Sequence, residues 1–449
     1  MRQNYDFINK PSREALFHMS LPIMAGMILN TAYNIVDSLW IGNLMGDTAL
    51  AALTNSTPII NIMFALGMGI TSGMEIFLSN HLAENDKQKE ESIISSTMIM
   101  IAVISIVLVI FVELSLNGIL TLMNTKPETF PYAKDYLTIY LIGMIPTFIS
   151  CHVSSTLRCY GDSVVQMLTM LITSVLNAVL DPILIKVIGF HGAAIATVLA
   201  QTTSLLLQLA YCRKKNYFHL NFRAWKKDYI FPVVRLSIPT VIQHCTPSLS
   251  GTVLTACVSD FGVTAMAAYG ISGKLDTILF MPSMAISMAL TPIIGYCAGG
   301  GRKDRAADYI KVSLKFSVCL VMISGTLLWL WGKRIAGSFG CSPEVADLVQ
   351  RCIRFLVWGY LLNSATQCFV SRINGFGQPG KSMMITLLNH GAIRIPLSIL
   401  LSRTVLGLDG IWLTLLFSFI VSFVCAVIID RRVTSMPKGE NDLSGALSQ

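Results

Sequence analysis

The stretch LPIMAGMILNTAYNIVDSLWIG, from Leu21 to Gly42, holds the pattern that decides the fold. It carries a single charged side chain, Asp37, and it is long enough to cross a bilayer as a helix, which takes about 20 apolar residues. Similar runs recur along the whole chain of 449 residues, which is 53% hydrophobic and only 13% charged, with a mean hydropathy of +0.63. An ordinary soluble domain has about 25% charged residues. The sequence therefore predicts a protein that crosses a membrane many times.

Twelve apolar runs predict an all-α integral membrane protein with twelve transmembrane helices. The first run continues past Pro22 to Trp40 without a small-residue cleavage site, so we interpret it as a permanent helix and not as a secretory signal. The expected spans cover residues 15–44, 49–80, 93–123, 131–157, 164–188, 192–212, 231–259, 263–298, 309–331, 345–371, 382–401 and 408–429.

The distribution of Lys and Arg predicts which side of the membrane each loop faces. With twelve spans both termini lie on one side, and the loops of that side carry most of the basic residues. By the positive-inside rule this side is the cytoplasm, so we expect a multi-pass protein of the plasma (inner) membrane with both termini cytoplasmic. The opposite side holds only Lys126, Lys134, Lys186, Lys333, Arg334 and Arg403.

An internal repeat divides the chain into two pseudo-symmetric six-helix lobes. Three pairs of matching segments lie at nearly the same offset, 216 or 217 residues apart. The pairs are SLPIMAG at Ser20 with SIPTVIQ at Ser237, GDTALAALTNS at Gly46 with GVTAMAAYGIS at Gly262, and RCYGD at Arg158 with NGFGQ at Asn374. We expect a cytoplasmic N-terminus (1–14), an N-terminal lobe (15–212), a basic cytoplasmic linker (213–230), a C-terminal lobe (231–430) and a cytoplasmic tail (431–449). Two such lobes are the architecture that alternating access needs.

The composition excludes several other classes of protein. The net charge of +8 lies in short breaks between apolar runs and forms no basic face, so no nucleic-acid partner is expected. The 11 cysteines form no Cys-x-x-Cys pair, and no phosphate loop or dinucleotide fingerprint occurs. We therefore expect no cofactor, and partners limited to the lipid bilayer and small organic substrates, with a monomer as the default state.

Ionisable residues inside spans cost roughly 2.5 to 3.5 kcal/mol each on insertion scales, so each calls for a reason. Asp37 and Asp181 are expected at one depth, near the outer ends of their helices, with Tyr33 and Asn177 one turn deeper and Thr197 beside them. Such a pocket could bind sodium through Asp37, Asn177 and Asp181, or carry protons if the proximity of the two carboxylates raises the pKa of one of them. The alternative is isolated polar residues bonded to nearby backbone.

Two prolines accompany this predicted pocket. Pro22 lies within the first span and Pro182 directly follows Asp181. Each removes an amide donor and permits a kink, so a bend at Pro22 is a candidate gate, and a purely structural kink is the alternative.

The second half carries a different set of polar residues within its spans. They are candidates to line a substrate cleft, or alternatively serve as interhelical hydrogen-bonding partners, and an Arg394 to Asp276 pair is one expectation. The set is Gln243, His244, Lys274, Asp276, Asn363, Gln367, His390 and Arg394. Glu75 and Glu113 also fall within spans, but the sequence indicates no partner for them.

Four segments resemble the multidrug and toxic compound extrusion (MATE) family, and the resemblance covers almost the whole chain. They are the first-span stretch quoted above, TLRCYGD from Thr156, LNAVLDPILI from Leu176 and GAAIAT from Gly192. The resemblance implies twelve helices in two lobes around an outward-opening cleft. It also implies that Asp37, Asn177, Asp181 and Thr197 form a cation site in the N-terminal lobe, with Tyr33 beside it and Pro22 at a bend.

The function that this resemblance implies is a cation-coupled antiport. The coupling ion, a proton or sodium with protons preferred, would exchange for small organic, often cationic, compounds exported across the plasma membrane, and drug and antibiotic resistance would follow. An alternative is a flippase for a lipid-linked precursor of the same wider superfamily, for which Arg394 and Lys274 would line the cavity. A remote alternative is an intramembrane aspartyl enzyme using Asp37 and Asp181.

Overall fold

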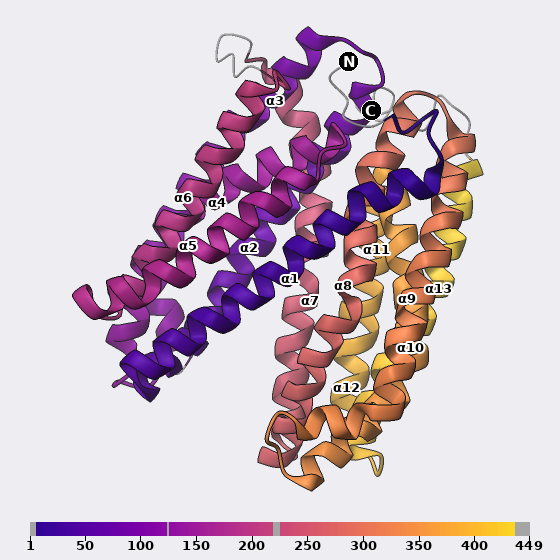
Figure 1. The fold of residues 1–449 in the computed structure, drawn as a ribbon. Coiled ribbons are helices and arrows are strands. Elements are labelled where there is room, and N and C mark those ends of the chain that lie inside the picture. The colour runs from indigo at the N-terminus through magenta and orange to yellow at the C-terminus, as the bar shows by residue number, and fades with distance from the viewer. Residues whose placement is uncertain (1–5, 124, 219–224, 436–449) are drawn as a thin grey trace. The chain divides into compact units, whose positions relative to one another are not determined.

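The computed structural model describes residues 6–123, 125–218 and 225–435, and within them every regular element is a helix (Figure 1). Ten helices in these ranges are long and apolar enough to cross a membrane. Two further helices, α7 (Ile230–Ser259) and α10 (Pro343–Gly375), have 30 and 33 residues. The expected fold class, an all-α membrane protein with twelve long helices, is confirmed.

The helices follow the predicted order. In the first half they are α1 (Ser12–Met45), α2 (Asp47–Leu82), α3 (Lys87–Leu122), α4 (Phe130–Cys159), α5 (Val164–Ile188) and α6 (His191–Lys214). A short 3₁₀ helix, η2 (Lys227–Tyr229), precedes α7, which is followed by α8 (Val263–Gly299), α9 (Lys303–Gly337), α10, α11 (Pro379–Thr386), the π-helix η3 (Leu387–Arg394), α12 (Ile395–Ser402) and α13 (Gly407–Ser435). Because α11, η3 and α12 are continuous, they form one span.

The chain folds into two compact units. Unit 1 contains Leu21–Val241, and unit 2 contains Phe7–Ser20 and the residues from Ile242 onward. The division therefore falls inside α1 and inside α7 and not within the linker between α6 and α7. Parts of the predicted termini and linker, residues 1–5, 219–224 and 436–449, lie outside the described residues.

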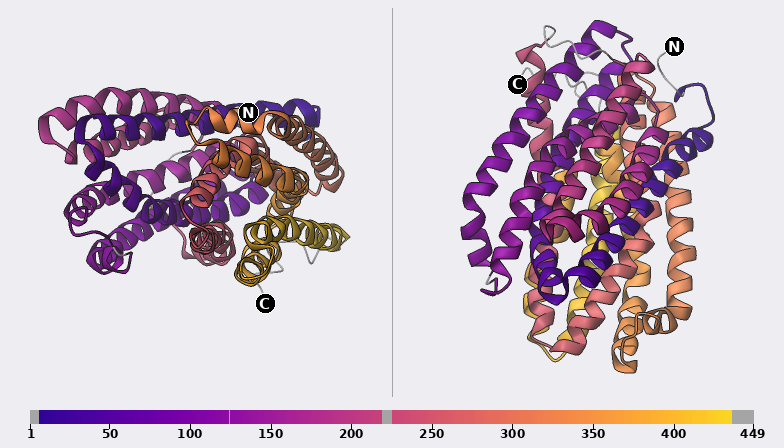
Figure 2. Two further views of the ribbon diagram at one scale, coloured as in Figure 1. Left: turned by 90° about the horizontal axis from the view of Figure 1, so that it is seen from below. Right: turned by 60° about the vertical axis from the view of Figure 1, so that its left-hand side comes forward.

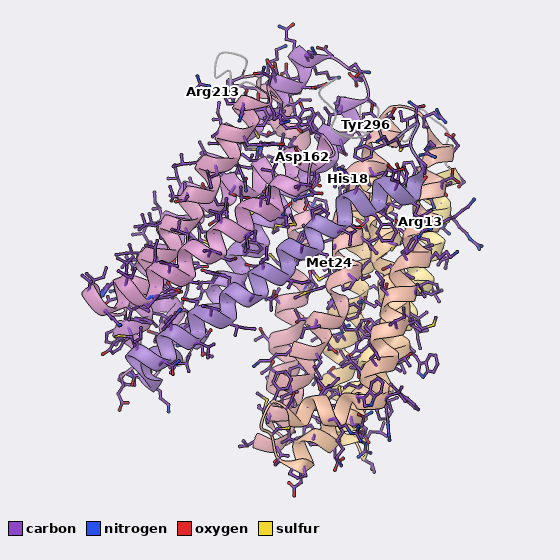
Figure 3. The ribbon with its side chains drawn as sticks, viewed as in Figure 1. Arg13, His18, Met24, Asp162, Arg213 and Tyr296 are labelled. Carbon is purple, nitrogen blue, oxygen red and sulfur yellow. The ribbon has the colours of Figure 1, made fainter. Side chains whose placement is uncertain are left out.

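The first turns of α1 belong to unit 2. The guanidinium of Arg13 lies 5.3 Å from the centre of the Phe316 ring on α9, and the Phe17 and Phe316 ring centres are 4.5 Å apart. Figure 3 labels Arg13, His18 and Met24 in order along α1. Arg13 and His18 belong to unit 2, and Met24 belongs to unit 1. Pro22 lies next to this point, where α1 passes from one unit to the other.

The first turns of α7 belong to unit 1, where they pack closely on α2. Thr240 Oγ1 donates to the Gly69 carbonyl at 2.6 Å, and Ser237 Oγ donates to the Ile70 carbonyl at 3.1 Å. A Cβ placed on Gly69 would lie 2.4 Å from Val241 Cα, and one on Gly73 would lie 2.6 Å from Ser237 Cα. Glycines four residues apart allow two membrane helices to approach at the backbone, so this motif holds the start of α7 in unit 1.

The same packing arrangement occurs in both units. In unit 1, α4 packs against α2, α3 and α6, and in unit 2, α10 packs against α8, α9 and α13 (Figure 2). The turn between the first two helices of each repeat uses glycine in a left-handed conformation, with φ of 78° at Gly46 and 89° at Gly262. A side chain would strain both turns, so the left-handed backbone explains why glycine occurs at both matching positions.

The centres of the two units are filled differently at equivalent positions. In unit 2, Ser283, Ser317 and Ser364 join α8, α9 and α10 through three mutual hydrogen bonds of 2.6 to 2.9 Å, and all three are buried. At positions 216 residues earlier, unit 1 has Gly67 on α2 and Phe148 on α4, and a Cβ on Gly67 would lie 2.7 Å from the Phe148 ring. One repeat thus uses an aromatic ring over glycine where the other uses hydroxyl groups.

Replacing both Gly69 and Gly73 by Ala should destabilise the protein by about 1 to 3 kcal/mol, because each added methyl group overlaps backbone of α7. The measurement is thermal unfolding of the purified protein in detergent. Gly118→Ala on α3 is the matched control, because nothing lies within 4 Å of its added Cβ. Equal melting temperatures for the double variant and the control would contradict close packing of α7 on α2.

Candidate functional site

Five polar side chains from three helices meet inside unit 1. Tyr33 and Asp37 lie one turn apart on α1, Asn177 and Asp181 lie one turn apart on α5, and Thr197 lies on α6. All five are buried, and Asn177 and Asp181 have no exposed surface. The structure therefore brings together every residue of the pocket predicted from the sequence.

Thr197 holds the cluster in place. Its hydroxyl donates to the Ala193 carbonyl at 3.2 Å, so its oxygen accepts from the Tyr33 hydroxyl at 3.1 Å and from Asn177 Nδ2 at 3.4 Å. Asn177 Nδ2 also donates to Asp181 Oδ1 at 3.1 Å. Both lone pairs of Thr197 are thereby used, which makes it a positioning residue and leaves the carboxyl and amide oxygens as the ligand atoms.

Three oxygens at the centre of the cluster are buried acceptors without a hydrogen-bond donor among the described residues: Asp37 Oδ1, Asn177 Oδ1 and Asp181 Oδ2. The Asp37 and Asp181 carboxyl groups are close enough to hydrogen-bond to each other. Such a bond requires a proton on one of them, because two ionised carboxylates only accept. The three oxygens therefore form a set of acceptors whose chemistry suits a cation or a proton.

The kind of cation is limited by the ligands. No group of three or more His, Cys, Asp or Glu side chains within the described part of the chain could hold a metal ion. Two carboxylates and one amide oxygen are hard ligands that suit a proton or a sodium ion better than a transition metal.

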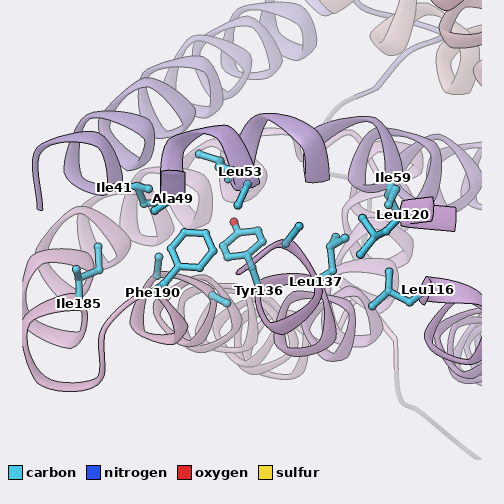
Figure 4. Packing of buried hydrophobic residues seen from close by; sticks show 14 residues of the cluster. Ile41, Ala49, Leu53, Ile59, Leu116, Leu120, Tyr136, Leu137, Ile185 and Phe190 are labelled. Carbon is cyan, nitrogen blue, oxygen red and sulfur yellow. The ribbon is translucent and has the colours of Figure 1, made fainter. Parts of the chain in front are cut away.

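Two tyrosines on α4 complete the surroundings of Asp37, and sequence reasoning missed them. Tyr136 and Tyr140 lie close enough to Asp37 to interact with its charge, and their ring centres are 5.6 Å apart. Tyr136 stacks on Phe190 at 5.1 Å within an apolar cluster that also contains Ile41 (Figure 4). Their spacing of four residues within a span was the available signal, but it does not identify which helix they face.

α1 remains helical through Pro22. The candidate gate residue is thus placed at the division between the units and well before Asp37 along the helix. The residues after Pro22 carry the site, and the residues before it belong to unit 2.

The structure brings together three of the eight polar residues predicted for a substrate cleft in the second half. Asp276 on α8 accepts a hydrogen bond from the Tyr360 hydroxyl, and Arg394 NH1 donates to His390 Nδ1 at 3.2 Å within η3. Asp276 and Arg394 interact electrostatically, but they form no direct ion pair, so the predicted pairing is absent.

Two of the other five residues of that set contact other parts of unit 2. Gln243 donates to the Pro379 carbonyl at 3.0 Å and to Ser382 at 3.1 Å, so it connects α7 to α11. Lys274 is exposed and lies 6.0 Å from the Phe339 ring centre. The remaining three are an exposed His244 and the half-buried Asn363 and Gln367.

Glu75 has a partner that the sequence did not indicate. Arg158 of α4 donates to both of its carboxylate oxygens, at 3.0 and 2.8 Å, and also to Gln166 at 3.0 Å. The side chains of Arg158 and Glu75 are only 4% and 6% exposed. Glu113, the other unexplained acid, accepts from Thr138 at 3.2 Å.

A second polar contact lies at the same end of unit 1. Asp162, labelled in Figure 3, accepts hydrogen bonds from Tyr211 at 3.0 Å and from Tyr217 at 2.8 Å. Burial and then the Asp162 hydrogen bond raise the pKa of the Tyr217 phenol above its ordinary value, so it remains a donor at neutral pH. The TLRCYGD motif therefore anchors helices of unit 1 to one another.

Comparison with known proteins places the chain among relatives of similar length. The model of the MatE family matches residues 22–183 and again residues 239–400. The chain is 25% identical over 95% of its length to the probable multidrug resistance protein YpnP of Bacillus subtilis, of which the match covers 96%. It is also 25% identical over 96% of its length to an FAD transporter of Shewanella oneidensis, with 97% of that protein covered. A solved structure described as the outward-facing conformation of a multidrug resistance MATE family transporter has the same fold, with a TM-score of 0.89, 21% identity and coverage of 96% and 98%.

Arg158→Gln should destabilise the protein by about 3 to 5 kcal/mol, because it leaves the Glu75 carboxylate buried without its charged partner. Glu75→Gln combined with Arg158→Gln should restore much of that loss, since no isolated charge remains. Arg302→Gln, at an exposed pair with Asp304, is the control and should leave the melting temperature nearly unchanged, because water screens that pair. Thermal unfolding of the three purified variants decides, and equal losses for Arg158→Gln and Arg302→Gln would contradict a buried ion pair.

Proposed function

The chain belongs to the MatE family and is therefore a multi-pass membrane transporter rather than an enzyme, and on this premise we propose that it is a cation-coupled antiporter that exports small organic compounds. The coupling ion is a proton or sodium, and the proton is preferred. The observation that carries this proposal is the buried Asp37 and Asp181 pair with its acceptor oxygens left without donors.

The carboxyl pair can bind and release one positive charge. With one proton shared between them, or with sodium bound to the three free oxygens, the repulsion between Asp37 and Asp181 is relieved. When the cation leaves, two like charges remain in a buried site, and this state is stable only if the surroundings rearrange. The direct contact between the two carboxyl groups favours a proton, because a single proton satisfies both of them.

Helix α1 links the cation site to the rest of the molecule. It carries Asp37 and Tyr33 within unit 1, and its first turns up to Ser20 belong to unit 2. A change in the contacts of Asp37 therefore acts on a helix whose two ends are held by different units. Pro22 lacks the amide hydrogen that would resist bending at this point, which supports its role as the gate.

The exported molecule in this proposal is a small organic compound. The names of two relatives support a broad range of substrates. YpnP is named for multidrug resistance and the Shewanella protein for transport of FAD. Both termini face the cytoplasm in this proposal, because the loops of that side carry most of the Lys and Arg residues. The protein acts in the plasma membrane as a monomer, and the flippase and aspartyl-enzyme alternatives are not favoured.

The proposal is tested by efflux of ethidium from energised cells with the proton and sodium gradients collapsed separately. Wild type should extrude the dye only while one of the two gradients is present. Asp37→Asn and Asp181→Asn should reduce efflux to the level of cells without the protein, because each variant removes one of the two like charges whose repulsion drives uptake of the cation.

Asp135→Asn is the matched control for the efflux test. This acid lies on α4 with 53% of its side chain exposed, 3.6 Å from His191, and it should leave efflux unchanged. Immunoblots of membrane fractions establish that all variants reach the membrane. Gradient-dependent efflux that survives in both aspartate variants would refute the proposed coupling site.

Pro22→Ala should slow gradient-driven transport by roughly threefold or more without lowering thermal stability, because the added amide hydrogen bond stiffens α1 at its bend. Initial rates in proteoliposomes give the transport rate, and unfolding in detergent gives the stability. Pro127→Ala, in the exposed connection between α3 and α4, serves as control. An unchanged rate for Pro22→Ala would argue for a purely structural kink.

A further inference from the structure

The π-helix η3 contains one residue more than the corresponding part of the first repeat. The left-handed Gly161 before α5 matches the left-handed Gly377 before α11 at an offset of 216. Near the other end of these helices, Gly192 approaches the backbone of Leu184 and Gly410 approaches that of Leu401, and the two leucines are 217 residues apart. A π-helix is the usual result of one inserted residue, and such insertions are frequent at functional sites.

The insertion determines what stands at the position of the cation site in unit 2. With the offset of 217 that holds after it, Arg394 corresponds to Asn177 and Ser398 corresponds to Asp181. At the same offset, the position of Asp37 is taken by Leu254, which is buried in an apolar cluster. Unit 2 therefore has a guanidinium where unit 1 has ligands for a cation.

The hydrogen bonds of Arg394 leave part of its guanidinium available. Nε and NH2 point to Ser418 Oγ at 3.4 and 3.2 Å, NH2 also points to Asn389 Oδ1 at 3.3 Å, and NH1 points to His390 Nδ1 at 3.2 Å. These distances lie at the long end of the range for N–H donors, and all the acceptors are neutral. A guanidinium has five N–H donors, so one on NH1 remains without an acceptor in the described part of the chain.

His390 supplies a second donor beside the first. Arginine cannot accept a hydrogen bond, so His390 Nδ1 is the acceptor and its ring proton is on Nε2. No hydrogen bond from Nε2 to another described residue is present. Two N–H donors on one π-turn therefore have no acceptor of their own.

The charge of Arg394 is also not neutralised by direct contact. No carboxylate among the described residues lies within ion-pair distance of Arg394, and the nearby Asp276 is held by the Tyr360 hydroxyl. The guanidinium carbon lies 5.0 Å from the centre of the Phe419 ring, which covers one of its faces. What remains is the NH1 edge, and a planar fork of this kind matches a carboxylate or phosphate.

The anion that binds Arg394 could come from a transported molecule or from a membrane lipid. The depth of Arg394 in the membrane favours the transported molecule. Arg394 is eight residues before the end of the span at Ser402, about 12 Å along the helix, within a hydrocarbon layer about 30 Å thick. Headgroups of bilayer lipids remain at the surface. A charged side chain retained at this depth is expected to serve a substrate pathway.

We propose that Arg394 and His390 form a subsite in unit 2 for the carboxylate or phosphate group of the transported molecule, so that organic anions and zwitterions are among its substrates. This inference rests on the proposed transport function and names a substrate class for it. Asp276 sets the strength of the subsite by partly offsetting the positive charge of Arg394.

The test uses a rhodamine dye in two forms, as its free benzoate and as the methyl ester of that group. The ester lacks the negative charge of the benzoate and carries one additional methyl group. Binding of each form to the purified full chain in phosphatidylcholine nanodiscs is measured by fluorescence anisotropy. Arg394→Gln should weaken binding of the benzoate by about tenfold or more and should change binding of the ester by less than about twofold. Arg403→Gln, an exposed arginine just after α12, is the control and should change neither.

Two further variants keep the test decisive if Arg394→Gln does not fold. Arg394→Lys retains the charge without the fork and should give an intermediate loss for the benzoate. Asp276→Asn removes the opposing charge and should strengthen benzoate binding, which a merely structural role of Arg394 would not produce. A wild type that binds the benzoate no better than Arg394→Gln does, or that binds neither dye, overturns the inference.

Two other results distinguish this inference from a lipid-binding site and from the proposed transport function. Displacement of the benzoate when phosphatidic acid is added to the nanodiscs would assign the subsite to a lipid headgroup and overturn its assignment to substrate. Uptake of the ester into proteoliposomes tests the proposed function on its own, because it depends on a gradient and on Asp181 but not on Arg394. Ester uptake without dependence on any gradient would refute the antiporter while the benzoate preference for wild type would still support the subsite.

Discussion

The requirement that polar groups within the hydrocarbon find partners inside the protein governs this structure. Lipid offers no hydrogen bonds, so each buried charge fixes the packing of the helix that carries it. Arg158 and Glu75 tie α4 to α2 in this way, and the polar cluster around Thr197 ties α1 and α5 to α6. The Asp37 and Asp181 pair differs, because Asp37 Oδ1 and Asp181 Oδ2 are buried without a hydrogen-bond donor among the described residues. The need for hydrogen-bond partners thus stabilises the helix packing at most buried polar groups, and the proposed transport function uses the buried groups that have none.

The two repeats meet that constraint with opposite charges. At the cluster around Thr197, unit 1 buries Asp37 and Asp181, and unit 2 places Arg394 at the position of Asn177. In the proposed antiporter, the acidic site of unit 1 would bind the coupling cation and the basic site of unit 2 would bind an anionic group of the substrate, so the two sites would have complementary roles. A duplicated fold allows this, because the helix packing is preserved while the side chains at equivalent positions change.

Exchange of helix ends between units gives the two halves a physical connection. The first turns of α1 lie in unit 2 and the first turns of α7 lie in unit 1. Each exchange occurs within about three residues of a proline of the repeat, Pro22 in α1 and Pro239 in α7. Proline interrupts the hydrogen bonds of a helix, so these are the points where the two ends of one helix can respond to different surroundings. The close glycine contact of α2 with α7 shows how firmly one such end is held.

The sequence by itself determined the helices, their order, the repeat and the residues of the first polar cluster. These follow from hydropathy and spacing, which are local properties of the chain, because backbone hydrogen bonds in a bilayer must be made within each helix. The tertiary structure alone decided which side chains meet. It paired Arg158 with Glu75, placed Arg394 near Asp276 without a direct ion pair between them, and placed Tyr136 beside Asp37. Those contacts depend on how each helix is rotated about its axis and on which helix it packs against, and neither property is written in the spacing of one span.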